Sequence, residues 1–379
     1  MHSSVNGSRR RFLRSAGVTG VALTAPVSLA SRAAAKSSSG KLVFIYDDSV
    51  AEDYTKTFPV HQDEDVPACS AAVSGQLGEK DRLTVKQLRE MSNAGWEVMS
   101  HTVHHRALGP LQLAEDASKG DTKVYERSNR HGEHPGDEVI ISNGTKEETV
   151  TVTGKGSDDT GEYVTLKNSL EKSFIADNST MRYTDEILHS EIFDSKKQLE
   201  EDGFNAANMV LPYGINGQQA EAMIQKEYDA LANAEFADGL NPITGFDPYH
   251  LSRAYFKPDS ETKKKLGTYL DTVAKGDVLG ILAGHSSYDD FEPKRVRTAI
   301  QMAKDRNIEI LTLRDAMVDM GIIEQQTTTT TTTTTSSEKT TTTSNDESTS
   351  TTKSSGQPGF GFATALTGLG ALAWRQSRR

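Results

Sequence analysis

The chain has 379 residues, a formal net charge of −11 and a single cysteine, Cys69. This length provides for one large domain or two ordinary ones. The acidic balance disfavours nucleic acid and anionic membranes as partners, and it suits solubility in concentrated salt. One cysteine excludes an intramolecular disulfide, so the expected role of Cys69 is a buried small apolar side chain rather than a reactive thiol.

The first 35 residues are basic and weakly apolar, as an export signal is. They contain five arginines and no acidic residue. Residues 8–14 (SRRRFLR) resemble a twin-arginine signal, and the alanines at 33–35 offer a small-residue cleavage site. Such a signal implies export of the folded protein by the twin-arginine translocase. A disordered basic leader is the alternative interpretation.

Short apolar runs alternate with amphipathic stretches from residue 41 onward, which is typical of βα units around a parallel sheet. Residues 42–46 (LVFIY) predict a buried first strand. A capping-box pattern that starts at Thr84 predicts a helix that stops at Gly95, and residues 96–99 predict the next strand.

Helical periodicity is absent between residues 118 and 181. Runs at 139–141, 149–153 and 163–166, with a turn at Asn143-Gly144, predict β-hairpins. Glycosylation acceptor patterns at Asn143 and Asn178 fit an exposed location. We therefore predict an inserted β-rich domain over 118–181, within an α/β domain that occupies residues 36–117 and 182–323.

The α/β pattern resumes after this insertion. The expected helices span residues 184–201, 218–227, 261–274 and 293–306, and the expected strands span 208–211, 230–234, 278–282 and 308–311. The predicted fold class is therefore α/β.

The chain ends in two segments that lack a globular pattern. Residues 324–356 are rich in Thr and Ser, and because such a tract cannot bury a core it predicts an extended stalk. Residues 357–379, with a Pro-Gly-Phe start, an apolar middle and a basic end, resemble the sorting tails that archaeosortases remove in halophilic archaea. We expect an exported protein that is anchored at the cell surface through its processed C-terminus.

Titratable residues follow three predicted strands. Asp47 and Asp48 come after the first strand, His101 and His105 after the second, and His285 after a later apolar strand. In parallel α/β folds, active sites form where the strands end. One carboxylate and two imidazoles can complete a metal site with open positions. An aspartate capping pair, surface histidines and a structural histidine are the alternatives.

Together these segments resemble the polysaccharide deacetylase family (NodB-like). The resemblance consists of Asp47-Asp48, the run HTVHH at 101–105, Pro212-Tyr213 and the run LAGH at 282–285. It covers residues 41–115 and 183–318. It implies that the α/β part is a distorted (β/α) barrel.

The resemblance also implies a role for each residue. Asp47 would be the general base and His285 the general acid, while the backbone N–H of Tyr213 would help to bind an oxyanion. The implied metal ligands are Asp48, His101 and His105. Zinc is the first choice of metal, with cobalt or another first-row ion as the alternative.

Two positions depart from the family pattern. Ser49 stands where the family has glycine, and Val210 replaces the arginine that orients the catalytic aspartate. We expect Arg253, in the next connecting region, to supply this charge instead. A surface ion pair is the alternative role for Arg253.

The expected function is metal-dependent removal of acetyl groups from an extracellular or cell-surface polysaccharide, with N-acetyl as first choice and O-acetyl as a further substrate. Three other readings stay open: hydrolysis of another linear amide, a catalytically inactive carbohydrate-binding surface protein, and a function carried by the inserted domain. In the inserted domain His131 and His134 are weak candidates for metal binding.

Overall fold

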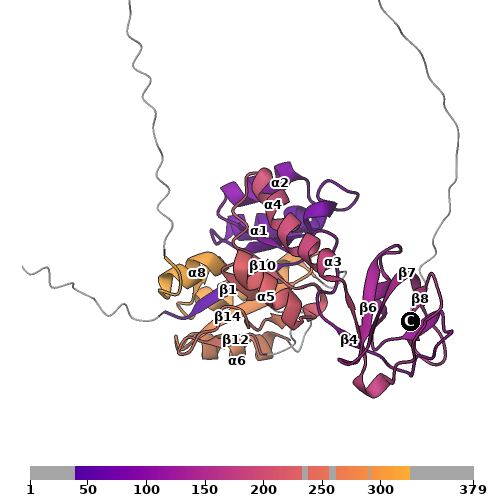
Figure 1. Ribbon diagram of the computed structural model, residues 1–379. Helices are drawn as coiled ribbons and strands as arrows, with labels where there is room; N and C mark the ends of the chain where they lie inside the picture. The colour runs from indigo at the N-terminus through magenta and orange to yellow at the C-terminus, as the bar shows by residue number, and fades with distance from the viewer. Residues whose placement is uncertain (1–38, 233–237, 256–261, 289–290, 325–379) are drawn as a thin grey trace, which may run out of the picture. The chain divides into compact units, whose positions relative to one another are not determined.

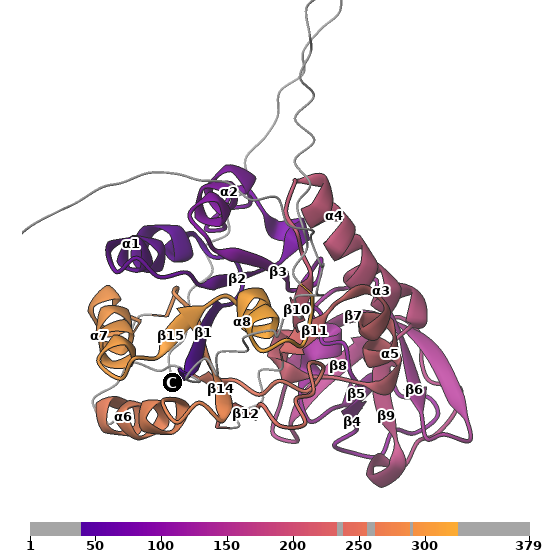
Figure 2. The ribbon, with the colours of Figure 1, turned by 90° about the vertical axis from the view of Figure 1, so that its left-hand side faces the viewer.

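The computed structural model describes residues 39–232, 238–255, 262–288 and 291–324. Most of them form a curved, largely parallel sheet with helices outside it (Figure 1, Figure 2). Its strands are β1 (Lys41–Tyr46), β2 (Cys69–Ala72), β3 (Glu97–Ser100), β10 (Asn208–Val210), β11 (Ala230–Ala232), β12 (Leu240–Pro242), β13 (Ala254–Tyr255), β14 (Val278–Gly284) and β15 (Glu309–Leu311).

The sheet closes on itself. Its order is β11-β10-β3-β2-β1-β14-β12, and β13 runs parallel to β14. A parallel bridge joins Ala232, at the end of β11, to Leu251, which shortly precedes β13. β15 pairs with β1, and β12 is antiparallel to β14. The fold is therefore a distorted (β/α) barrel, as the sequence predicted.

Helices surround the strands (Figure 2). They are η1 (Asp53–Thr57), α1 (Phe58–Asp63), α2 (Val85–Asn93), α3 (Asp185–His189), η5 (Ser190–Asp194), α4 (Ser195–Glu201), α5 (Gln218–Glu227), α6 (Thr262–Val273), α7 (Pro293–Lys304) and α8 (Leu313–Asp319). Short helical turns occur at η2 (Ser74–Gln76), η3 (Asn129–Gly132), η4 (Ala176–Asn178) and η6 (Pro212–Gly214). In the described residues, no helix has the length and apolar character needed to cross a membrane.

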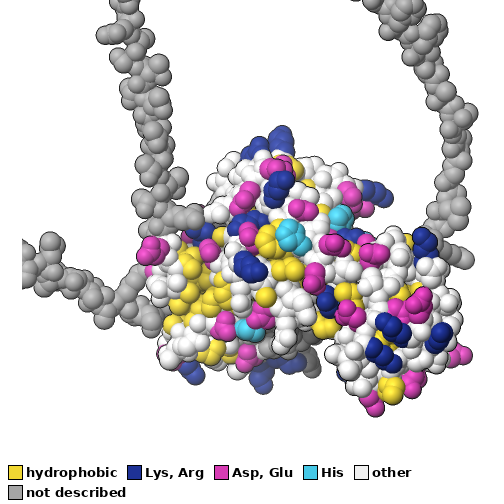
Figure 3. Space-filling view, in the orientation of Figure 1, with side chains coloured by type: hydrophobic (Ala, Val, Ile, Leu, Met, Phe, Trp, Pro, Cys, Tyr) yellow, Lys and Arg dark blue, Asp and Glu magenta, His cyan; other side chains and the backbone are white. Residues whose placement is uncertain are grey.

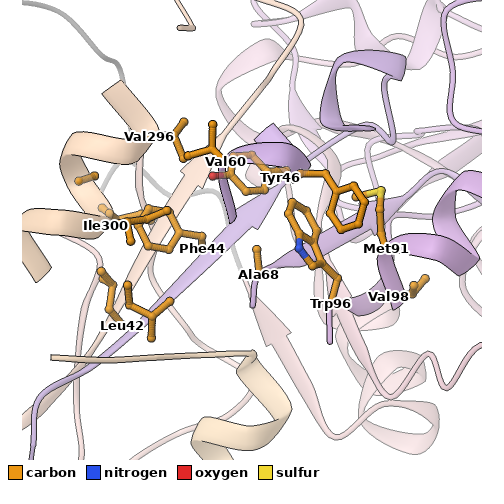
Figure 4. Packing of buried hydrophobic residues seen from close by; sticks show 14 of the residues in the cluster. Leu42, Phe44, Tyr46, Val60, Ala68, Met91, Trp96, Val98, Val296 and Ile300 are labelled. Carbon is orange, nitrogen blue, oxygen red and sulfur yellow. The ribbon is translucent and has the colours of Figure 1, made fainter. Parts of the chain in front are cut away.

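The barrel core is built around β1, all of whose residues are buried. Tyr46 stacks on Trp96 with ring centroids 5.4 Å apart, and Phe44 on the same strand points toward Val296 and Ile300 of α7 (Figure 4). A strand that is buried on both faces has a continuous apolar sequence. This burial explains why residues 42–46 could be recognised from sequence.

The inserted domain is a six-stranded sheet of order β4-β9-β6-β7-β8-β5, in which neighbouring strands are antiparallel. The strands are β4 (Leu111–Gln112), β5 (Lys123–Tyr125), β6 (Glu138–Ser142), β7 (Glu147–Ser157), β8 (Glu162–Leu166) and β9 (Thr180–Tyr183). Asn143 closes the β6–β7 turn by accepting hydrogen bonds from the N–H groups of Thr145 and Lys146. On the face in Figure 3, acidic and basic side chains are interspersed over these strands.

Several details differ from the sequence-based expectations. The inserted sheet extends beyond 118–181, because Leu111 of β4 pairs with Met181 of β9. The expected helix over 184–201 contains a π-helical segment, η5. The strand β2 was not predicted, because its sequence, CSAA, contains no β-branched or aromatic residue. Cys69 is buried in β2, where its sulfur accepts a hydrogen bond from the Leu313 N–H.

Candidate active site

A cavity of about 490 Å³ lies at the carboxyl ends of the barrel strands. Its lining comprises Asp47, Asp48, His101, His105, Ser128, Arg130, Leu211, Tyr213, Ile215, Tyr255, His285 and Tyr288. All the predicted site residues except Arg253 are in this lining, and Arg253 lies directly behind it. Segments far apart in the sequence thus meet because parallel strands end on the same side of the barrel.

Asp48, His101 and His105 form a compact group of potential ligands. The Nε2 atoms of His101 and His105 lie 3.5 and 3.1 Å from Oδ1 of Asp48. One ligand atom from each residue lies within 4.8 Å of the other two. Oδ1 of Asp48 is buried and has no hydrogen-bond donor among the described residues.

The other ring nitrogens determine which atoms of the histidines face Asp48. Nδ1 of His101 is 2.9 Å from the Val210 carbonyl oxygen, which can only accept, so this nitrogen carries the proton. Nδ1 of His105 is 3.0 Å from the Tyr213 hydroxyl. With the proton on Nδ1, Nε2 presents a lone pair toward Asp48. Three acceptors that converge without a donor between them fit a divalent cation, and the donor set suits zinc and other first-row ions.

Asp47 lines the cavity and forms a salt bridge with Arg253. The guanidinium makes a bidentate pair, with Nη1 2.8 Å from Oδ1 and Nη2 2.9 Å from Oδ2, and both side chains are buried. Burial by itself would raise the pKa of Asp47, but the charge and hydrogen bonds of Arg253 outweigh it and lower that pKa. Asp47 is therefore ionised at neutral pH. The structure gives Arg253 a buried partner in the site rather than a surface one.

His285 faces both carboxylates. Its Nε2 lies 3.9 Å from Oδ2 of Asp47 and 3.6 Å from Oδ2 of Asp48. Its Nδ1 lies 3.1 Å from the Tyr255 hydroxyl, and its ring stacks on Tyr288 at 4.9 Å between centroids. These contacts place an imidazole nitrogen where it can exchange a proton with a bound molecule.

Tyr213 occupies η6 with φ 60°, a left-handed conformation that non-glycine residues adopt rarely. None of the described residues accepts a hydrogen bond from its backbone N–H. Its hydroxyl donates to Oε2 of Glu133 at 2.8 Å. Burial, and then the bond to Glu133, raise the pKa of this hydroxyl, so it remains a donor at neutral pH.

The inserted domain also contributes to the site, which the sequence did not indicate. Ser128 and Arg130 line the cavity, and Glu133 bonds to Tyr213. Tyr255 and Tyr288 were likewise not singled out. No motif marks these residues. The approach of Ser128, Arg130 and Glu133 depends on how the insert packs against the barrel, and Tyr255 and Tyr288 reach the cavity from β13 and from the segment after β14.

The remaining histidine candidates have other partners. His104 donates its backbone N–H to Glu191 at 2.9 Å and is not among the grouped ligands. His131 is buried beside Glu126, with Nδ1 2.8 Å from Oε1. In the part of the chain that the structure describes, the only group of metal-ligand type is Asp48, His101 and His105, so His131 and His134 form no such group.

The fold and the site thus define a (β/α) barrel with a two-histidine, one-carboxylate centre beside an ionised aspartate. Residues 34–133 match the family model described as polysaccharide deacetylase. This match supports a polysaccharide deacetylase domain in the chain and includes Asp47, Asp48, His101 and His105.

A protein of Bacillus subtilis (strain 168), YxkH, whose name assigns it to the polysaccharide deacetylases, is 31% identical over 85 residues. The alignment covers 22% of this chain and 30% of that protein's length. The chain therefore matches less than a third of this relative.

Solved structures with a similar fold include the following two. A family 4 acetyl xylan esterase from Clostridium thermocellum, in complex with a cobalt ion, has a TM-score of 0.42 and 11% identity, covering 74% of this chain and 91% of the other. The chitin deacetylase of the fungus Colletotrichum lindemuthianum has a TM-score of 0.40 and 11% identity, covering 73% and 87%.

Proposed function

We propose that the chain is a metal-dependent hydrolase that removes acetyl groups, N-acetyl first, from a polysaccharide outside the cell. The observation that carries the proposal is the convergence of Asp48, His101 and His105 beside Asp47, which Arg253 holds ionised. The family match over residues 34–133 supports the choice of substrate class.

Asp48, His101 and His105 would hold the cation. A bound divalent ion lowers the pKa of water and polarises an acyl carbonyl. Asp47 accepts the proton of the attacking water, because its carboxylate is ionised and faces the cavity. Two hydrogen bonds from Arg253 hold the Asp47 carboxylate in this orientation.

His285 and Tyr213 complete the chemistry. His285 donates a proton to the departing amine nitrogen, since its Nε2 points to the same space as the two aspartates. The backbone N–H of Tyr213 donates to the oxygen that becomes negative as water adds to the carbonyl. One such donor typically contributes about 3 kcal/mol to the transition state.

The test is acetate release from N-acetylglucosamine oligomers by the purified protein in high salt, with zinc, with cobalt and after chelation. We expect release that depends on metal and that Asp48→Ala abolishes, while Glu148→Ala in the inserted sheet behaves as wild type. A metal-loaded, folded protein that releases no acetate from N- or O-acetylated glycans would contradict the substrate. A protein that binds no metal would favour the carbohydrate-binding alternative.

The location outside the cell is also a proposal. The export signal over 1–35 and the sorting tail over 357–379 lie outside the described residues, as does the stalk from residue 325 onward. Mass spectrometry of the protein isolated from its host tests this: cleavage near residues 33–35 and loss of the C-terminal segment are expected, and an intact chain would contradict it.

A further inference from the structure

A chain of hydrogen bonds runs from the inserted domain to one ligand of the candidate metal centre. Glu133 follows η3 of the inserted domain and accepts a hydrogen bond from the Tyr213 hydroxyl, with the oxygens 2.8 Å apart. The same hydroxyl lies 3.0 Å from Nδ1 of His105. Two residues of the barrel are thus connected to a carboxylate of the insert.

The direction of each bond follows from the chemistry of the groups. An ionised carboxylate only accepts, so the Tyr213 proton points to Glu133. The hydroxyl oxygen then accepts from Nδ1–H of His105. The proton is thereby held on Nδ1, and Nε2 keeps its lone pair toward Oδ1 of Asp48, 3.1 Å away.

Glu133 is itself firmly held. Its Oε1 accepts from Nη1 of Arg130 at 2.7 Å and from Nζ of Lys155 at 2.6 Å. Burial opposes ionisation, but these bonds outweigh it and lower the pKa of Glu133. The Arg130 guanidinium also lies over the Tyr213 ring, 4.1 Å from its centroid. The carboxylate therefore stays charged and in place.

The two histidine ligands differ in what orients them. His101 donates Nδ1–H to the carbonyl of Val210, which belongs to the barrel strand β10. His105 has φ 64° on an irregular segment after β3, and it is oriented by a side chain that the insert controls. The barrel alone therefore constrains the ring orientation of His105 less than that of His101.

We propose that Glu133 is a positioning residue for the metal centre, acting through Tyr213 on His105, so that the inserted β domain completes the site of the barrel. The inference rests on the proposed metal-dependent function. Partners that orient a metal-ligating histidine typically contribute about 10- to 100-fold to metal affinity.

The experiment measures zinc affinity of the full chain by competition with a chromogenic chelator, without substrate. Glu133→Ala should weaken zinc binding by about 10- to 100-fold. Glu133→Gln, which keeps an acceptor but not the charge, should lose less. The matched control is Glu148→Ala, since Glu148 is another half-buried carboxylate of the inserted sheet, where it accepts from backbone N–H groups of Glu171 and Lys172. It should bind zinc as the wild type does.

A double-mutant cycle separates this route from a general loosening of the insert. Tyr213→Phe removes the hydroxyl but keeps the backbone N–H, and it should weaken zinc binding itself. In the Tyr213→Phe background, Glu133→Ala should cost little more, because the connection is already broken. If the two losses add in full, Glu133 does not act through Tyr213 and the inference is overturned.

Zinc binding by the wild type distinguishes a failure of the proposed function from a failure of the inference about Glu133. A wild-type protein that binds no zinc removes the proposed function and, with it, this inference. Equal zinc affinity of the wild type and Glu133→Ala removes only the inference. Circular dichroism of each variant in the presence of a chelator verifies folding, and if Glu133→Ala is unfolded, the comparison of Glu133→Gln with wild type decides by the same criterion.

Discussion

At the scale of single residues, backbone strain is concentrated at the candidate active site. Left-handed φ values occur in the described non-glycine residues Asp48, Ser49, Thr102, His105, Tyr213, Asp65, Asp81 and Asn307. The first five belong to the site or adjoin it, and of these five only Asp48 is of the Asp or Asn type that tolerates this conformation, as all of the last three are. Each strained residue costs on the order of 1 kcal/mol. The surrounding fold supplies this energy; the Thr102 hydroxyl, for example, accepts from the His105 N–H at 2.8 Å.

Removal of Arg253 should affect catalysis through Asp47 alone, because its guanidinium pairs with Asp47 and with none of the three candidate metal ligands. Arg253→Ala leaves the buried Asp47 unpaired, so we expect kcat to fall by about 100-fold with a much smaller change in KM. The free energy of unfolding should fall by about 3 kcal/mol, because a buried charge loses its partner. Steady-state kinetics and denaturant titration measure the two effects.

The control for Arg253 is Arg306→Ala, which breaks a surface pair with Asp271. An exposed pair contributes about 1 kcal/mol or less, so this variant should keep wild-type kinetics. Wild-type kcat in Arg253→Ala would show that Asp47 needs no such partner.

His61 should make the barrel sensitive to acid. Its ring is fully buried against Tyr46 and Trp96, and burial lowers its pKa from 6.5 to about 4. As the pH falls below 6.5, the unfolded chain binds the proton first. The stability that neutral His61 contributes is therefore complete above 6.5 and is lost down to about pH 4, a total of about 3 kcal/mol.

His61→Gln tests this linkage by denaturant unfolding at pH 7.5 and 4.5 in the presence of a chelator. The decrease in stability on acidification should be about 2 kcal/mol smaller than in the wild type. Replacement of the exposed His189 by Gln is the control. The same decrease in His61→Gln and wild type would count against His61 as the acid-sensitive group.

At the scale of elements, local sequence explains some helices completely. In the capping box of α2, the Thr84 hydroxyl accepts from the Gln87 N–H at 3.2 Å, and the Gln87 side chain accepts from the Thr84 N–H at 2.9 Å. Leu88 and Met91 then bury one face of the helix. These contacts lie within a few residues, so the beginning and the buried face of α2 were predictable.

Thr84→Ala should lower the free energy of unfolding by about 1 kcal/mol, because the Gln87 N–H in the first turn loses the hydroxyl that accepts its hydrogen bond. Thermal or chemical unfolding measures the change. Thr298→Ala inside α7, where the hydroxyl only bonds back to the Lys294 carbonyl, should be close to neutral. Equal effects at the two positions would refute a specific capping contribution.

At the scale of the whole molecule, insert and barrel belong to one compact unit. A single apolar cluster contains Val139, Ile141 and Val164 of the inserted sheet together with Leu188 and Ile224 of barrel helices. Arg106 adds a polar connection, with Nε 2.6 Å from Oδ2 of Asp137 in the insert and Nη1 bonded to the buried Glu191 of η5. Through Arg106, Glu191 of the π-helical segment η5 is connected to Asp137 of the insert.

Arg106→Met should therefore destabilise more than the loss of an ordinary ion pair. Glu191 remains buried, loses the guanidinium and keeps its hydrogen bonds with His104, so we expect a decrease of about 3 kcal/mol in the free energy of unfolding. Arg297→Met, which disrupts the pairs with the exposed Asp63 and the half-buried Glu64, is the control and should cost about 1 kcal/mol or less. Similar effects of the two changes would argue that the Arg106 connection is unimportant.

The sequence by itself determined those features that depend on interactions between residues close together in the chain. Apolar runs of strand length predicted β1 and β14, and the strand ends placed Asp47, His101 and His285 on one side of the barrel. The turn at Asn143 was predictable for the same reason, since its hydrogen bonds are local. The catalytic roles of Asp47 and His285 and the metal-binding role of His101 are predictions from the family resemblance.

Only the tertiary structure decided the contacts between distant segments. Arg253 and Asp47 are 206 positions apart, and Glu133 reaches Tyr213 from 80 positions away. Strand β2 forms from small residues because β1 and β3 flank it. Such pairings depend on chain closure and on packing summed over many residues, which no short stretch of sequence encodes.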